Sequence, residues 1–107
     1  MAIDNNRLLL ELEKQRKEIN RSIINPAIPE LSLESLNPML TMVAQARKNY
    51  LCCLTEMADI CQGKAPDSEQ VATLRGYREI YDELVSAVNA LETAIQRDYL
   101  DVRTSRR

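Results

Sequence analysis

The sequence predicts an all-α protein, an antiparallel up-down-up three-helix bundle or coiled-coil hairpin with a long C-terminal helix. Only two glycines occur in 107 residues, and the Gly-rich turns and β-branched runs of sheet proteins are missing. Apolar residues recur at alternating spacings of 3 and 4, the a/d pattern of helices that pack along their length. Capping signals and prolines divide the chain into helices of about 4–24, 38–62 and 68–102, which we treat as a single domain, 1–107.

The first helix, 4–24, has a broad apolar face. Asp4 is the expected N-cap, because its carboxylate can accept hydrogen bonds from the free amides of the first turn. The heptad seam holds four apolar residues and one arginine: Leu9, Leu12, Arg16, Ile19 and Ile23. Leu8 and Leu10 widen the apolar arc around Leu9, so this helix needs more than one neighbour to bury it.

The connector 26–37 is too apolar for a mobile linker. Asn25-Pro26 ends the first helix, because a residue that precedes proline is driven out of the helical region. The apolar residues of the connector are Ile28, Leu31, Leu33 and Leu36. We expect an ordered crossover, with one helical turn at 33–36, packed against the end of the bundle.

The second helix, 38–62, has start and stop signals. Asn37 is the expected cap and Pro38 the first helical residue, where the missing amide costs nothing. Gly63 is expected to end the helix in a left-handed conformation. The predicted seam is Leu40, Val43, Arg47, Tyr50, Leu54, Met57 and Cys61.

The third helix, 68–102, is the longest periodic stretch. Asp67 and Gln70 have the spacing of a capping box at its start. Its predicted seam is Leu74, Tyr77, Tyr81, Leu84, Val88, Leu91 and Ile95. Gly76 lies inside this helix, either as a close backbone crossing or kink or as a tolerated small residue.

The C-terminal part of the third helix predicts an uncovered apolar surface. A second helix ending near residue 62 can cover the third only up to about Glu92, which leaves an overhang. Within one chain, the crossover residues Ile28, Leu31, Leu33 and Leu36 could cover it. We favour instead a homodimer built from the first helix and the overhang. Its candidate interaction surface is Leu8, Leu9, Leu10, Ile95, Tyr99, Leu100 and Val102.

The residue inventory lacks the parts of common catalytic sites. There is no histidine, the commonest general base and metal ligand, and no Gly-rich phosphate-binding motif. Cys52, Cys53 and Cys61 have neither the number nor the spacing of a structural zinc site. We therefore expect no enzymatic activity, no metal and no cofactor.

The expected location is the cytoplasm. An odd number of cysteines, two of them adjacent, is typical of a reducing compartment. Leu8, Leu9 and Leu10 run directly into Glu11, which is not the pattern of a signal peptide. Because no apolar stretch is long enough to span a bilayer, no membrane association is expected.

The leading interpretation is a non-enzymatic helical protein–protein interaction module, a small adaptor, regulator or chaperone-like protein that binds itself and another protein. In composition alone, and through no motif, the chain resembles secretion chaperones and bacterial regulatory adaptors. The net charge of −2 gives no bulk attraction for nucleic acid. The alternative is a nucleic-acid-associated regulator that uses the basic tail 103–107, with Arg103, Arg106 and Arg107, and the basic stretch from Lys14 to Arg21.

Overall fold

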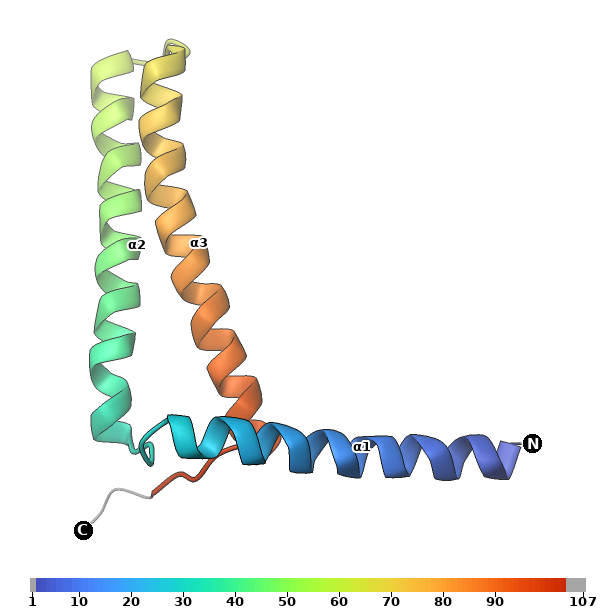
Figure 1. Cartoon of the computed structure of the whole chain (residues 1–107). Coiled ribbons are helices and arrows are strands. Elements are labelled where there is room, and N and C mark those ends of the chain that lie inside the picture. The colour runs from blue at the N-terminus through green and yellow to red at the C-terminus, as the bar shows by residue number, and fades with distance from the viewer. Residues whose placement is uncertain (1, 104–107) are drawn as a thin grey trace. The chain divides into compact units, whose positions relative to one another are not determined.

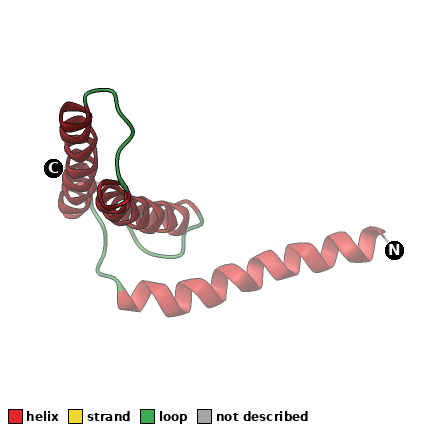
Figure 2. Cartoon of the chain, turned by 90° about the horizontal axis from the view of Figure 1, so that it is seen from above, coloured by secondary structure: helices red, strands yellow, loops and turns green. Residues whose placement is uncertain are grey.

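A computed structural model describes residues 2–103 and confirms the all-α fold (Figures 1 and 2). The helices are α1 (Ala2–Ile24), α2 (Leu33–Cys61) and α3 (Ser68–Gln96), with a short 3-10 turn, η1 (Asn25–Ala27), after α1. Within the described residues, none of these helices is long and apolar enough to cross a membrane.

The chain divides into two compact units. The hairpin unit, Leu36–Asn89, contains most of α2 and α3. The terminal unit joins residues from the two ends of the chain, Met1–Ser35 and Ala90–Arg107.

In the hairpin unit, α2 and α3 pack against each other as antiparallel neighbours, as predicted (Figure 1). The turn between them begins with Gln62 at φ 51° and Gly63 at φ 84°, so the expected left-handed glycine is present. The capping box that starts α3 is also present. Gln70 donates its amide to the Asp67 carboxylate at 2.8 Å, and Asp67 donates its amide to the Gln70 side chain at 2.9 Å.

The seam of α2 differs from the predicted one. Leu40 and Leu54 are exposed, whereas Ala46 is only 7% exposed and Cys53 is half-buried. The buried row therefore runs through Val43, Ala46, Tyr50, Cys53 and Met57, spaced by alternating steps of 3 and 4. Small side chains at two of these positions let two helices approach closely, which large leucines would prevent. The predicted seam is therefore wrong at Leu40 and Leu54, and Ala46 and Cys53 face inward beside the positions predicted for Arg47 and Leu54.

Arg47, which was predicted at a seam position, lies over an aromatic ring of α3. Its Nε and Nη2 atoms donate to the Tyr81 hydroxyl at 3.0 and 2.8 Å. The guanidinium carbon is 5.2 Å from the Tyr81 ring centroid, within the range of a cation–π contact. Tyr50 packs beside the same ring, with centroids 6.1 Å apart. The Arg47 guanidinium thus contacts both the ring and the hydroxyl of Tyr81, although Arg47 as a whole is exposed.

The start of α2 is a second correction, because the helix begins at Leu33 rather than at Pro38. Ser32 and Ser35 cap it reciprocally: Ser32 donates its amide to Ser35 Oγ at 2.8 Å, and Ser35 donates its amide to Ser32 Oγ at 3.2 Å. This pair satisfies amides that the helix itself cannot satisfy. Pro38 lies inside the helix, and Asn37 is not its cap.

In the terminal unit, α3 ends at Gln96, six residues before the predicted end at 102. Asp98 adopts the left-handed conformation, at φ 62°. Tyr99 donates its amide to the Ala94 carbonyl at 2.9 Å, and Asp98 donates its amide to the Ile95 carbonyl at 3.1 Å. These two bonds form a Schellman motif, in which aspartate takes the place usually occupied by glycine.

After this motif the chain runs beside the crossover. Leu31 and Val102 form a single parallel bridge, in which Leu31 donates its amide to Asp101 at 3.2 Å and accepts from Arg103 at 2.7 Å. Leu31 is 5% exposed and Leu100 2%, so these two side chains form the core of the terminal unit together with Ser32 and Ala94.

The start of α1 also differs from the prediction. The helix begins at Ala2, so Asp4 lies in its first turn and is not the cap. A carboxylate there still interacts favourably with the helix dipole. The seam residues of α1 do not lie in a core, because all five are exposed.

Two glycine substitutions are expected to change stability in opposite directions. A Cβ built on Gly76 meets nothing within 4 Å, so Gly76→Ala should raise the free energy of unfolding by about 1 kcal/mol through helix propensity. Gly63→Ala should lower it by about 1 kcal/mol, because φ 84° is unfavourable for alanine. Urea unfolding followed by circular dichroism measures both changes. A loss of stability in Gly76→Ala would show that a close crossing exists there after all.

Candidate helix-docking face

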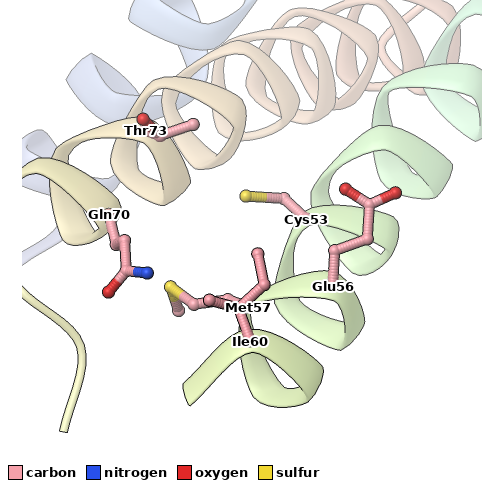
Figure 3. A pocket seen from close by; sticks show the side chains of 6 residues that line it. All are labelled: Cys53, Glu56, Met57, Ile60, Gln70 and Thr73. Atoms are coloured by element: carbon pink, nitrogen blue, oxygen red, sulfur yellow. The ribbon is translucent and has the colours of Figure 1, made fainter.

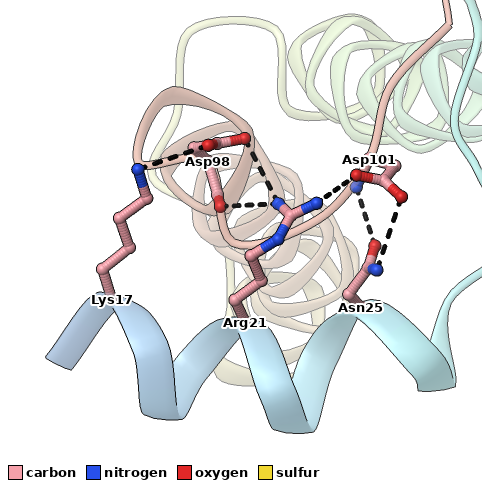
Figure 4. Close-up of polar contacts among 5 residues, drawn as sticks. All are labelled: Lys17, Arg21, Asn25, Asp98 and Asp101. Atoms are coloured by element: carbon pink, nitrogen blue, oxygen red, sulfur yellow. Dashed lines mark hydrogen bonds and ion pairs between the residues drawn. The ribbon is translucent and has the colours of Figure 1, made fainter. Parts of the chain in front are cut away.

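Polar residues on one side of α1 attach it to the segment that follows α3 (Figure 4). Lys17 Nζ lies 3.3 Å from an Asp98 carboxylate oxygen. Arg21 donates from Nη1 to the Asp98 carbonyl at 2.9 Å and to its carboxylate at 3.3 Å, and from Nη2 to the Asp101 carboxylate. Asn25, one residue past α1, accepts from the Asp101 amide at 2.8 Å. Two cations, two carboxylates and one amide thus fix which side of α1 faces its own chain.

The Schellman motif positions these carboxylates. Because Asp98 is left-handed, the chain turns sharply after α3, and both Asp98 and Asp101 meet the same side of α1. The sequence pattern predicts continuous helix over 97–102, and this prediction does not place the two carboxylates against α1. A left-handed aspartate has only a weak sequence signal, since most aspartates adopt other conformations.

The opposite side of α1 is apolar, and its side chains are exposed. We call it the open α1 face. It consists of Leu8, Leu9, Leu12, Ile19 and Ile23, which are between 46% and 67% exposed. Since successive helical residues are rotated by about 100°, these five side chains fall within an arc of about 100°, away from Lys17 and Arg21. Leu10 is also exposed but lies about 200° from Leu8, outside this arc.

An ion pair within α1 lies near the middle of the helix, at and beside this face. Arg16 Nη1 contacts the Glu13 carboxylate one helical turn earlier, and both side chains are about half exposed. Arg16 occupies the seam position between Leu12 and Ile19, while Glu13 lies at its edge.

The residues of the predicted interaction surface differ in their exposure. Leu8, Leu9 and Leu10 are exposed, whereas Leu100 is buried against its own chain and Ile95 and Tyr99 are half-buried. Of the predicted crossover cover, Leu31 is buried, Ile28 and Leu36 are half-buried, and Leu33 is exposed. Leu100 is thus buried within its own chain, while Val102 stays 52% exposed.

The basic residues of the alternative interpretation are partly engaged within the chain. The side chains of Lys17 and Arg21 contact carboxylates. Arg103 is bonded through its backbone, since its amide donates to the Leu31 carbonyl. Lys14, Lys17 and Arg97 line a surface cavity of about 420 Å³ together with Glu13 and Tyr99. Arg106 and Arg107 lie outside the described residues.

The hairpin unit carries a small open cavity of about 180 Å³, shown in Figure 3. Its lining residues are Cys53, Glu56, Met57, Ile60, Gln70 and Thr73. The Gln70 side chain is already engaged by the Asp67 amide and, at 3.5 Å, by the Cys61 thiol. The three cysteines are free thiols, and residues 2–103 contain no group of three or more His, Cys, Asp or Glu placed to hold a metal ion. The open α1 face is a feature of the terminal unit with an evident binding chemistry, the burial of exposed aliphatic side chains.

Comparison of this chain with protein-family models, with curated proteins and with solved structures gave no match.

Proposed function

We propose that this chain is a non-enzymatic protein–protein interaction module, a small adaptor, regulator or chaperone-like protein whose α1 offers an apolar face to a protein partner. The observation that carries the proposal is the open α1 face, five large apolar side chains that are between 46% and 67% exposed. A contiguous apolar stripe of this kind marks an interaction site more often than a free surface.

The way α1 is held supports the same proposal. Lys17, Arg21 and Asn25 engage Asp98 and Asp101, so turning the apolar stripe inward would break these contacts. An amphipathic helix held in this way can present leucines and isoleucines at helical spacing to a partner helix. Each such side chain contributes about 1.5–3 kcal/mol when it is fully removed from water.

Two further observations agree with this proposal. The cations Lys17 and Arg21 are paired with carboxylates, which reduces the positive charge they could offer to a nucleic acid. The odd number of cysteines, two of them adjacent, is typical of a reducing compartment, and on this ground we propose the cytoplasm as the location.

Capture experiments with two matched variants test the proposal. Leu12→Asp places a charge on the open α1 face, whereas Lys14→Asp places the same residue on another exposed side of α1. Tagged full-length chain, produced in its own cells, should retain a protein partner or an untagged copy of itself. Leu12→Asp should reduce the retained amount about tenfold or more, because a hot-spot leucine is replaced by an unpaired charge.

The control distinguishes the alternatives. Lys14→Asp should bind as the wild type does, and circular dichroism should show equal helix content in both variants. Unchanged capture by Leu12→Asp would exclude the open α1 face as the binding site. Loss of binding in Lys14→Asp alone, together with steep weakening by salt, would favour the nucleic-acid interpretation instead.

A further inference from the structure

The charges on the open α1 face are self-complementary. Arg16 is the one charged residue on its seam, and Glu13 is the one charged residue at the heptad positions that flank this seam. The other edge residues are Asn6, Leu8, Gln15, Asn20 and Ser22, none of which is charged. A partner surface therefore needs one anion and one cation near the middle of the helix and neutral residues elsewhere. A second copy of α1 has this pattern.

An antiparallel arrangement of two copies aligns the pattern. Suppose that the two-fold axis crosses the open α1 face at the level of Lys14, close to the middle of α1, although Lys14 itself lies on the other side of the helix. The two helices then overlap over almost their whole length. Leu9 of each copy then lies beside Ile19 of the other, and Leu12 beside the stem of Arg16. In this register Glu13 of one copy and Arg16 of the other fall on the same lateral side, offset by about 1.5 Å along the axis.

We propose that the open α1 face binds a second copy of this chain, with two α1 helices packed antiparallel as a coiled coil around the axis near Lys14. Glu13 and Arg16 of the two copies then alternate in a ring of four charges at the centre. This inference rests on the proposed function, since it names the partner of the same face. It differs from the sequence-based dimer, which also used the third-helix overhang, because Leu100 is covered within its own chain.

The apolar area suits a dimer of moderate affinity. Burying five large aliphatic side chains removes on the order of 500 Å² per copy from water, so the total, roughly 1,000 Å², lies near the lower limit for a specific interface. The Arg16 stem and the edge residues add to this area. Antiparallel pairing also places opposite helix-dipole ends beside each other, which a parallel pair would not do.

Charge reversal followed by mixing tests both the partner and the register. Light scattering of the wild type in the micromolar range should give about twice the chain mass of 12.2 kDa. Arg16→Glu alone and Glu13→Arg alone should each weaken dimerisation about tenfold or more, because each puts four like charges at the axis. An equimolar mixture of the two variants should recover the doubled mass, since each Glu then meets an Arg of the other copy. Lys14→Glu, which lies off the face, should dimerise as the wild type does.

Other outcomes would overturn the inference. A wild-type mass of 12.2 kDa at all these concentrations would exclude the second copy. If Leu12→Asp still abolished capture in that case, the proposed function would stand with a different protein as partner. Binding of wild-type monomer to anionic lipid vesicles, lost in Leu12→Asp, would identify a membrane surface instead. A doubled mass that neither reversal changes, or that mixing fails to restore, would place the dimer contact elsewhere.

Discussion

Replacement of Leu100 by alanine is expected to lower the free energy of unfolding by about 2–5 kcal/mol. Leu100 is only 2% exposed and lies in the same buried cluster as Leu31. The substitution would remove apolar contacts and leave a cavity in a unit whose core contains few other large side chains. Urea unfolding followed by circular dichroism measures the change.

Val102→Ala is the matched control for this variant. Val102 belongs to the same segment and bridges Leu31 through its backbone, but its side chain is 52% exposed. The expected loss is below about 1 kcal/mol, because little of the side chain is removed from a buried environment. Equal losses in the two variants would show that the segment 99–103 is not packed as described.

Replacement of Ala46 by leucine is expected to destabilise the protein by about 1–3 kcal/mol through overpacking. Ala46 is 7% exposed and belongs to the buried row of α2. The larger side chain would force α2 and α3 apart around Tyr50 and its neighbour Tyr81. The unfolding free energy reports the loss, and the near-ultraviolet circular dichroism of the tyrosines reports the displacement.

Ala44→Leu serves as the control for Ala46→Leu. Ala44 is on the same helix but exposed, so the same substitution should change stability by less than about 0.5 kcal/mol. A stable Ala46→Leu together with an unstable Ala44→Leu would show that the buried row of α2 does not run through Ala46.

The parts of the fold that depend on local interactions could be predicted from the sequence. The all-α class, the capping box at Asp67 and Gln70, and the left-handed Gly63 each follow from residues a few positions apart. The early start of α2 was missed because Ser32 and Ser35 compete with the stronger-looking signal of Asn37 and Pro38. Either pair could start a helix, and propensity alone does not choose between them.

The seam of α2 could not be chosen from the spacing alone. Two apolar rows run along this helix, one through Leu40 and Leu54 and one through Ala46 and Cys53. Periodicity gives the direction of an apolar face only approximately, and the width of the apolar arc allows both rows. Packing against α3 selects the row with small side chains.

The candidate site could be predicted from the sequence only in part. The cluster at Leu8, Leu9 and Leu10 indicated an apolar face on the first helix that needs a neighbour. The opposite side of α1 is attached through Arg21, which binds Asp98 and Asp101, 77 and 80 residues away. Periodicity within one helix does not report pairs so far apart. Leu31 and Leu100 are also far apart in the sequence. For this reason the sequence left two possible covers for Leu100, the crossover or a second copy of the chain.

The long sequence separation within the terminal unit also bears on the order of folding. The hairpin joins residues that are close in sequence, such as Arg47 and Tyr81, 34 positions apart, so closing it costs little chain entropy. The terminal unit joins Arg21 to Asp98 and Asp101, which are 77 and 80 positions away, and so closes a much longer loop. We therefore expect the hairpin to form first, while α1 is not yet anchored to its own chain. A partner that recognises the apolar face of α1 can then reach this helix before the terminal unit has formed.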